Sequence, residues 1–293
     1  MYNVLEILRT LRLQERPLRF LAATALQKTG LSRHFKVKHK DYMLWFDQSG
    51  LSKAMWVDPN CRIEDNNLLH LLLRDGDTFL DVGANIGTLA LTASGIVGSA
   101  GRVYAIEPHP RTFPSLKSNI ALNKRGNITA INVALGADSG TILFSDRADD
   151  SQNAVIHSSE LQSQFLEVPV QRMDDLPLGK APITLLKIDV EGYEKLVLEG
   201  GPETLARTSY IYLEAYDRFF ARYGYTCIQL WELLREHGFQ VYRFQGGRYL
   251  APIPLDFESS RCENFIAIKD YQEICKRTLG VSDFIARGPK CRV

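Results

Sequence analysis

The sequence has little net charge and no long apolar run. Lys and Arg number 35 against 34 Asp and Glu, which leaves a formal charge of +1. A chain with this balance has no overall field that attracts nucleic acid or an anionic membrane surface. No stretch reaches the length of a transmembrane helix without charges or helix breakers. We therefore expect a globular protein that acts on a small-molecule or glycan partner, with no nucleic acid and no integral membrane segment.

Cysteine is also scarce, and its spacing excludes two classes of site. No Cys-x-x-Cys pair occurs, and an odd number leaves at least one thiol unpaired, which argues against a disulfide framework. The first residues mix charged and apolar side chains and lack the apolar core of a secretion signal. These features predict a cytoplasmic protein. The five cysteines are Cys61, Cys227, Cys262, Cys275 and Cys291.

The hydrophobic pattern divides the chain into a lead-in and cap region (1–74), a main domain (75–270) and a C-terminal tail (271–293). The lead-in is predicted to be helical to about Gly30, extended or a hairpin over 35–46, and helical over 64–73. In the main domain, short apolar runs alternate with helix-length segments, which predicts parallel strands with crossover helices. The expected strands are 78–82, 103–107, 128–133, 185–189, 210–214, 238–244 and 264–268, with the last two antiparallel about a Gly246-Gly247 turn. The expected fold is α/β, with a doubly wound, mostly parallel, seven-stranded sheet.

The segment from Asp81 to Gly87, Asp-Val-Gly-Ala-Asn-Ile-Gly, lies where a buried strand ends and a helix begins. Glycines at such a turn let the backbone approach a ligand, because a Cβ there would collide with it. A dinucleotide fingerprint requires glycines at positions 83, 85 and 88, but positions 85 and 88 are Asn and Thr. This departure argues against NAD and FAD.

Two acids at strand ends fit S-adenosylmethionine better. This cofactor has no pyrophosphate, and the ammonium of its amino-acid end needs a carboxylate such as Asp81. Glu107 ends the next strand, where an acid accepts both hydroxyls of an unphosphorylated ribose. A simpler interpretation is that both acids cap the helices that follow their strands. Both acids occur at the required strand ends, which favours a cofactor site.

Three segments resemble the FkbM family of O-methyltransferases. They are residues 81–87, Glu107-Pro108-His109-Pro110, and Leu186-Lys187-Ile188-Asp189-Val190-Glu191-Gly192-Tyr193-Glu194, and the similarity extends over about 75–268. His109 departs from the small amide more usual there, and we interpret it as a turn residue. The resemblance implies a class I, Rossmann-like methyltransferase that methylates hydroxyls of sugars, glycans or polyketide-like molecules. It also implies that S-adenosylmethionine contacts Asp81, Gly83, Ala84, Asn85, Gly87, Glu107, Pro108, Val133, Ala134 and Asp189, with adenine near Val133 and Ala134.

Methyl transfer is an in-line displacement that needs an aligned acceptor oxygen and a base. The candidate catalytic residues are Lys187, Asp189, Glu191 and Glu214, at the carboxyl ends of two neighbouring strands. Strand alternation sends 187, 189 and 191 to one side. An ordinary carboxylate is a weak base for an alcohol, so the base gains strength from burial or the alcohol is activated by Mg²⁺. Acids at strand ends are more often ligand contacts or caps than metal ligands, so Mg²⁺ is not favoured and no metal ligand is assigned.

Two other functions compete with this one. A nicotinamide-dependent oxidoreductase is disfavoured by the glycine spacing and by the absence of a Tyr-x-x-x-Lys pair. A non-catalytic S-adenosylmethionine-binding protein would act through the lead-in or the aromatic segment 216–223, but it would not need the carboxylates at 189, 191 and 214. The base, the acceptor and the oligomeric state stay open at this level.

Overall fold

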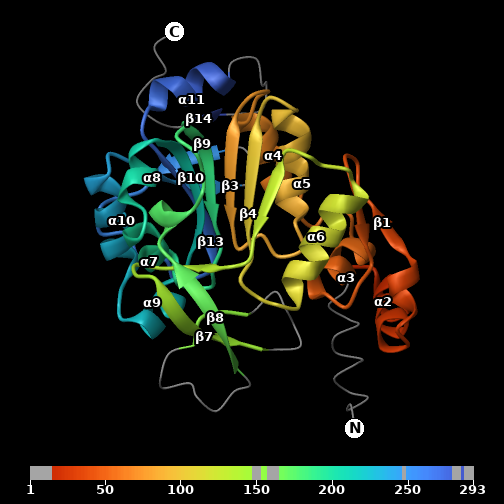
Figure 1. Cartoon of the computed structure of the whole chain (residues 1–293). Helices are drawn as coiled ribbons and strands as arrows, with labels where there is room; N and C mark the ends of the chain where they lie inside the picture. Colours follow the sequence, from red (N-terminus) through yellow and green to blue (C-terminus); the bar gives the residue numbers. More distant parts are fainter. Residues whose placement is uncertain (1–14, 147–152, 157–164, 246–248, 279–284, 287–293) are drawn as a thin grey trace.

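A nine-stranded sheet forms the centre of the molecule (Figure 1). The computed structural model describes residues 15–146, 153–156, 165–245, 249–278 and 285–286. Within them the strand order is β14-β12-β11-β13-β10-β9-β3-β4-β5. The bounds are β3 (Thr78–Val82), β4 (Arg102–Ile106), β5 (Ile128–Ile131), β9 (Ile183–Ile188), β10 (Thr208–Ala215), β11 (Gln240–Gln245), β12 (Tyr249–Pro252), β13 (Glu263–Ile268) and β14 (Ile285–Ala286).

The seven predicted strands are all present and form one continuous part of this sheet, from β5 to β11. Strands β5, β4, β3, β9 and β10 are parallel to one another, and β13 is antiparallel to both β10 and β11. The predicted doubly wound fold is therefore confirmed. The sequence did not predict β12 and β14, which extend the β11 edge, because strands this short give no readable alternation. The predicted Gly246-Gly247 turn lies outside the described residues.

Helices cover both faces of the sheet and produce three layers (Figure 1). Successive strand residues point to opposite faces, so Leu80 packs in one hydrophobic core and Phe79 in the other. The first face is covered by α7 (Glu194–Glu199), α8 (Pro202–Ala206) and α10 (Cys227–Glu236). The second is covered by α4 (Ile63–Leu72), α5 (Thr88–Val97), α6 (Thr112–Leu122) and α11 (Tyr271–Thr278). Strands buried on both faces explain the continuous apolar runs in the sequence.

Helix α10 was not predicted, although its sequence carries a start signal. The Thr226 side chain accepts from the Gln229 backbone N–H, while the Gln229 side chain accepts from the Thr226 N–H. This capping box begins a helix whose apolar residues recur at helical spacing. The aromatic segment before it forms α9 (Asp217–Phe220) and η5 (Ala221–Tyr223), where buried Phe220 stacks on Tyr225. Core packing therefore accounts for part of that segment.

The lead-in packs on the main sheet's second layer rather than forming a separate body. It contains α2 (Pro17–Lys28), η1 (Leu31–His34), β1 (Lys36–Lys38), β2 (Met43–Trp45) and α3 (Gly50–Val57), and β1 pairs with β2 as the predicted hairpin. Asn119 of α6 is fully buried, donates to the Ile86 carbonyl and accepts from the Trp45 N–H, each at 2.9 Å. One side chain thus joins the hairpin to the loop after β3. Residues 1–14, predicted to be helical, lie outside the described part.

A small second sheet lies beside the carboxyl ends of the parallel strands (Figure 1). It consists of β6 (Ala134–Leu135), β8 (Phe165–Gln171) and β7 (Gly140–Ser145), in that order. The sequence predicted one strand over 128–133. Instead β5 ends at Ile131 and the chain enters β6 at Ala134. The η4 turn (Met173–Asp175) then leads from β8 toward β9.

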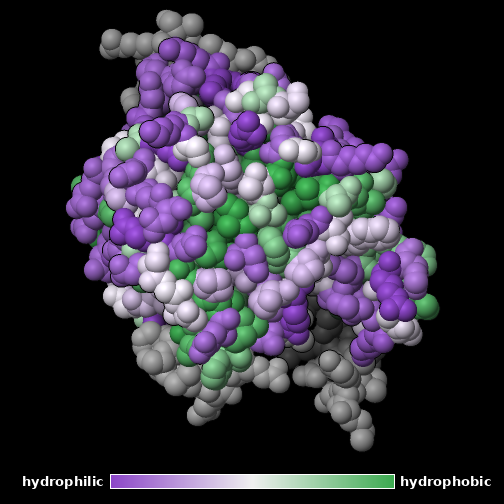
Figure 2. All heavy atoms as spheres, viewed as in Figure 1, coloured by the Kyte–Doolittle hydropathy of each residue, from purple (hydrophilic) through white to green (hydrophobic). Residues whose placement is uncertain are grey.

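The surface is mixed in polarity. On the face in Figure 2, hydrophobic residues form a band across the middle with hydrophilic surface on either side. Among the described residues, no helix has the length and apolar character required to cross a bilayer. Cys61, Cys227 and Cys262 are free thiols, whereas Cys275 is disulfide-bonded, which the cysteine spacing did not predict.

Candidate functional site

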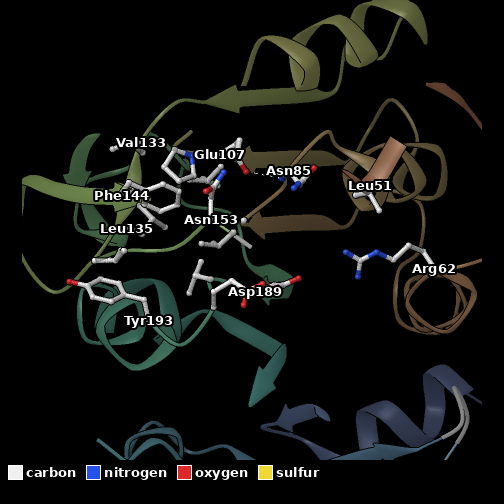
Figure 3. A pocket seen from close by; sticks show the side chains of 18 residues that line it. Leu51, Arg62, Asn85, Glu107, Val133, Leu135, Phe144, Asn153, Asp189 and Tyr193 are labelled. Carbon is white, nitrogen blue, oxygen red and sulfur yellow. Dashed lines mark hydrogen bonds between the residues drawn. The ribbon is translucent and has the colours of Figure 1, made fainter. Parts of the chain in front are cut away.

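A large cavity opens at the carboxyl ends of β3, β4 and β9 (Figure 3). Open α/β sheets bind ligands at this edge. The open space, including the mouth, is about 790 Å³, within the usual size range of small-molecule sites. It is lined by Leu51, Arg62, Val82, Gly83, Asn85, Ile106, Glu107, Pro108, Val133, Ala134, Leu135, Phe144, Asn153, Val155, Asp189, Val190, Glu191 and Tyr193.

The loop from Asp81 to Gly87 forms one wall, and its glycines are required by the fold. Gly83 and Gly87 have φ values of +78° and +91°, which L side chains rarely adopt. A Cβ on Gly83 would overlap the Asp189 carbonyl oxygen, and one on Gly87 would press against the Leu116 side chain. From the sequence we expected glycine at these positions because a Cβ would collide with a bound ligand. The structure gives tight packing against β9 and α6 as a reason that is independent of any ligand.

Glu107 lies at the centre of the cavity wall, on the segment after β4. Its Oε2 accepts the Asn85 N–H and its Oε1 accepts the His109 N–H, both at 2.9 Å. The residue is only 6% exposed. A carboxylate has two oxygens with about four acceptor sites between them. Two backbone N–H groups therefore orient a carboxylate that can accept a pair of hydroxyls.

The end of the cavity beyond Glu107 is apolar. Val133, Leu135 and Phe144 line it and are buried (Figure 3). Val133, Ala134 and Pro108 line the cavity where the sequence placed cofactor contacts. The sequence missed Leu135, Phe144, Asn153, Val155 and Tyr193, four of which come from the small sheet or segments near it. Tyr193 belongs to the third segment that resembles the FkbM family, and the polar–apolar alternation over 165–171 marks β8, the strand that pairs with β6 and β7.

Lys187 forms ion pairs beneath the loop. Its Nζ is 3.3 Å from Asp81 Oδ1 and 3.6 Å from Asp189 Oδ2, and it donates to the Gly83 carbonyl at 2.9 Å. Burial lowers the pKa of Lys187, but Asp81 and Asp189 more than offset this, so its pKa is raised. Burial raises the pKa of Asp81, against the opposing effect of Lys187.

Asp81 was predicted to contact the ammonium of the cofactor. The structure instead buries it to 1% exposure against Lys187, and Asp81 is not among the residues that line the cavity. Since Asp81 is opposite Lys187 in the β3–β9 register, its side chain supports the strand end. Asp189, which lines the cavity, is the better placed carboxylate.

A smaller polar cavity adjoins the large one and shares Arg62 and Asp189 with it. Its open space is about 310 Å³, and it is lined by Arg62, Asp65, Leu89, Lys187, Ile188, Asp189, Tyr212, Leu213, Glu214 and Asn264. Lys187, Asp189 and Glu214 therefore converge here, as their strand positions predicted. Glu191 lines only the large cavity, because it follows the end of β9 and its φ of +56° breaks the strand alternation.

Glu214 is the carboxylate of this cavity with the most perturbed environment. Burial raises its pKa, and the nearby negative charge of Asp189 raises it further. The Cys262 thiol is a hydrogen-bond partner that acts in the opposite direction. A carboxylate with a raised pKa is a stronger base than an ordinary one.

Arg62, Asp65 and Tyr212 were not foreseen as site residues. Asp65 Oδ1 accepts from the Tyr212 hydroxyl at 2.6 Å, and its Oδ2 accepts from Arg62 Nη1 at 3.1 Å. Burial lowers the pKa of Arg62, but Asp189 and Asp65 more than compensate, so it is raised overall. Arg62 comes directly before the leucine-rich helix α4. Nothing in that local sequence indicates that its side chain lines a cavity formed by the ends of β3, β4 and β9.

His109 has the structural role expected of a turn residue. Its Nδ1 accepts the Arg111 N–H at 3.2 Å, so the ring proton of the neutral form resides on Nε2, which donates to Asp146 at 3.1 Å. Burial and then Arg111 lower the pKa of His109, which favours this neutral form. The residue thereby holds the start of α6 and the end of β7.

No metal site is assigned. In the described part of the chain, no group of three or more His, Cys, Asp or Glu side chains is arranged to hold a metal ion. The charged groups that line the two cavities are carboxylates, the Arg62 guanidinium and the Lys187 ammonium.

The sheet order, the loop after β3 and the acid after β4 define a class I methyltransferase fold. The sequence profile of the methyltransferase FkbM domain matches residues 81–241. Since this match covers more than half of the chain, the chain belongs to the FkbM methyltransferase family.

Relatives with assigned names are similar over about half of this chain. Hexuronic acid methyltransferase AglP of Haloferax volcanii is 28% identical over 154 residues, 51% of this chain and 62% of AglP. 2-O-methyltransferase NoeI of Sinorhizobium fredii is 28% identical over 168 residues, 52% of this chain and 68% of NoeI. The match thus spans less than two thirds of AglP. The crystal structure of methyltransferase FkbM from Methylobacillus flagellatus aligns with a TM-score of 0.43 and 15% identity, over 74% of this chain and 52% of that one.

Proposed function

We propose that this protein transfers a methyl group from S-adenosylmethionine to a hydroxyl of a sugar or glycan. The observation that carries the proposal is the order of groups along one cavity: an apolar end, an oriented carboxylate at Glu107, and a charged end with Arg62 and Asp189. That order matches adenine, ribose and amino acid in one extended ligand. Membership of the FkbM family supports the same cofactor.

In this proposal the chain's own groups bind the cofactor in three places. Val133, Leu135 and Phe144 pack against adenine, and burial of a flat apolar ring there removes it from water. The carboxylate oxygens of Glu107 accept from the ribose hydroxyls. The loop at Gly83 and Asn85 lies against the part of the cofactor that carries the sulfur. S-adenosylmethionine supplies a methyl group made electrophilic by its sulfonium.

The acceptor hydroxyl would enter the smaller cavity, in line with that methyl group. Alignment of two reacting atoms supplies much of the rate of such a displacement. Lys187 Nζ is 3.6 Å from Asp189 Oδ2, and Asp189 lines both cavities, so its carboxylate is placed as a partner for a cation. Burial raises the pKa of Glu214, so Glu214 is the proposed proton acceptor. Asp189 would then face the sulfonium and the ammonium.

The charges of the smaller cavity favour an uncharged acceptor. Asp65, Asp189 and Glu214 outnumber Arg62 and Lys187 there, so an anionic group that enters is repelled on balance. A sugar hydroxyl also has the donors and acceptors that these side chains require. The names of the relatives, a hexuronic acid methyltransferase and a 2-O-methyltransferase, support a sugar acceptor, and the acid in the first name is the reason to test uronic acids beside neutral sugars. We retain the expectation of a cytoplasmic protein without a nucleic-acid partner as part of this proposal.

The first experiment is calorimetric titration with S-adenosylhomocysteine and, separately, with NADH. We expect micromolar binding of S-adenosylhomocysteine, none of NADH, and affinity at least about tenfold weaker in Glu107→Ala, since two charge-assisted hydrogen bonds are lost. Glu232→Ala, on the exposed face of α10, is the control and should bind as the wild type does. No binding by the wild type would refute the methyltransferase function.

The second experiment measures transfer of a radiolabelled methyl group to neutral sugars and to uronic acids. Glu214→Gln should lower kcat at least about 100-fold while S-adenosylhomocysteine affinity stays unchanged, because a positioned base contributes a factor of that order. A wild type that binds the cofactor product but methylates none of the sugars would favour the non-catalytic alternative. Faster transfer to uronic acids than to neutral sugars would contradict the electrostatic argument.

A further inference from the structure

The charged end of the large cavity carries one cation and one anion on opposite sides of the same space. Arg62 points into the cavity from the start of α4, and Asp189 comes from the end of β9 on the other side (Figure 3). The apolar residues Val133, Leu135 and Phe144 lie at the opposite end. A zwitterionic α-amino acid has one carboxylate and one ammonium, so its two groups match this pair of charges.

Arg62 is held in place before any ligand binds. One guanidinium nitrogen, Nη1, donates to Asp65 Oδ2 at 3.1 Å, and Asp65 is itself held by the Tyr212 hydroxyl at 2.6 Å. Among the described residues, the other guanidinium N–H groups have no hydrogen-bond partner. The Arg62 side chain is 32% exposed, and the residue lines both cavities. Donors that are fixed on one side and open on the other are suited to a carboxylate.

We infer that Arg62 binds the carboxylate of the methionine end of the cofactor, so the lead-in region supplies a cofactor ligand. Asp189 is the partner of the ammonium in this arrangement. The inference rests on the proposed function and adds to it a ligand that precedes the matched family region, 81–241. It also assigns Arg62 to the cofactor rather than to an acidic acceptor.

The neighbouring charges support the cofactor over an anionic acceptor as the partner of Arg62. Beyond Arg62, the smaller cavity adds Asp65 and Glu214 to the shared Asp189, with Lys187 as a further cation, so an anion placed deeper than the guanidinium is repelled on balance. The carboxylate therefore has its best position on the large-cavity side of Arg62. Placement there leaves the smaller cavity open to a neutral hydroxyl.

The test compares two ligands that differ only at the amino-acid end. S-adenosylhomocysteine has this end, whereas 5′-methylthioadenosine has the adenine, ribose and sulfur without it. Arg62→Ala should weaken S-adenosylhomocysteine binding by about 10- to 100-fold, as expected for a charge-assisted hydrogen-bond pair, and leave 5′-methylthioadenosine binding within twofold of wild type. Arg62→Lys should fall between, because it keeps the charge without the planar fork.

Arg102→Ala is the matched control. It removes an exposed arginine at the start of β4, at the amino ends of the parallel strands and away from the cavity. It should change neither affinity. Three outcomes would overturn the inference: unchanged S-adenosylhomocysteine affinity in Arg62→Ala, an equal loss for both ligands, or unchanged affinity with a raised KM for the sugar acceptor. If the wild type binds neither ligand, the proposed function itself fails, and the two failures are thereby distinguishable.

Discussion

Replacement of Lys187 by Met should destabilise the protein in a strongly pH-dependent way. The substitution keeps most of the side-chain volume but removes a cation that lies between two carboxylates, 3.3 Å from Asp81 and 3.6 Å from Asp189. Lys187 and Asp81 are 6% and 1% exposed at their side chains, so water cannot replace the lost partner of Asp81. The variant therefore has a buried carboxylate without its counter-charge.

The size of the effect follows from these distances. At an effective dielectric constant of about 20, each ion pair contributes about 5 kcal/mol of Coulomb attraction. Desolvation offsets much of this, and the removal of one partner from a buried pair usually costs about 3–5 kcal/mol. Burial already raises the pKa of Asp81, and loss of Lys187 raises it further. An acid whose folded-state pKa is raised stabilises the fold below its unfolded pKa and loses that contribution as pH rises. The cost should therefore grow from pH 5 to pH 8, by at most about 1.4 kcal/mol per pH unit.

Urea unfolding at pH 5 and pH 8 measures this cost. Lys117→Met, on the exposed face of α6, is the control and should stay within about 0.5 kcal/mol of wild type. The double variant Lys187→Met/Asp81→Asn should recover part of the loss, since it removes the unpaired charge. If Lys187→Met costs less than about 1 kcal/mol and costs the same at both pH values, the ion pair does not support this strand end as argued.

Three further predictions concern other parts of the structure. Asn119→Ala should lower the free energy of unfolding by about 2–3 kcal/mol in urea titration, because the buried Trp45 N–H and Ile86 carbonyl lose their partner; a change below 1 kcal/mol would contradict the proposed docking of the hairpin. Burial raises the pKa of Glu194 to about 8, so the wild type should lose stability relative to Glu194→Gln as pH rises from 5 to 9; thermal unfolding curves whose separation is independent of pH would be inconsistent with this. EDTA should leave the methyl-transfer rate within twofold, whereas a large loss restored by Mg²⁺ would show that a metal ion activates the acceptor.

Local sequence was sufficient for the sheet and for the loop that begins the site. Strands such as 78–82 and 183–188 are buried on both faces, so their sequences are nearly continuous apolar runs. Such runs can be recognised without knowing which strands lie beside them. The positive φ values at Gly83 and Gly87 favour glycine at these positions. Glu107 was also readable, because its position at the end of a parallel strand fixes the edge of the sheet at which it lies.

The structure gives two of the predicted site residues a role in packing beside the predicted role in binding. Gly83 was expected to make room for a ligand, but the atom that a Cβ would overlap is the Asp189 carbonyl oxygen. Asp81 was expected to face the cofactor, but it faces Lys187 beneath the loop. Both contacts depend on how closely β3 and β9 approach, and residue types alone do not give that distance.

Only the tertiary structure decided which distant segments complete the two cavities. Arg62 and Asp65 reach the site because α4 packs on α5, and Tyr212 meets Asp65 across 147 residues of chain. Phe144 reaches the apolar end because the short strands β6, β7 and β8 form a second sheet at the carboxyl edge. Local propensity and periodicity report how a segment folds on itself. The partners it meets depend on packing between elements far apart in sequence. The sequence by itself therefore determined the scaffold, the loop and the position of Glu107, while packing decided that Phe144 and Arg62 complete the two ends of the cavity.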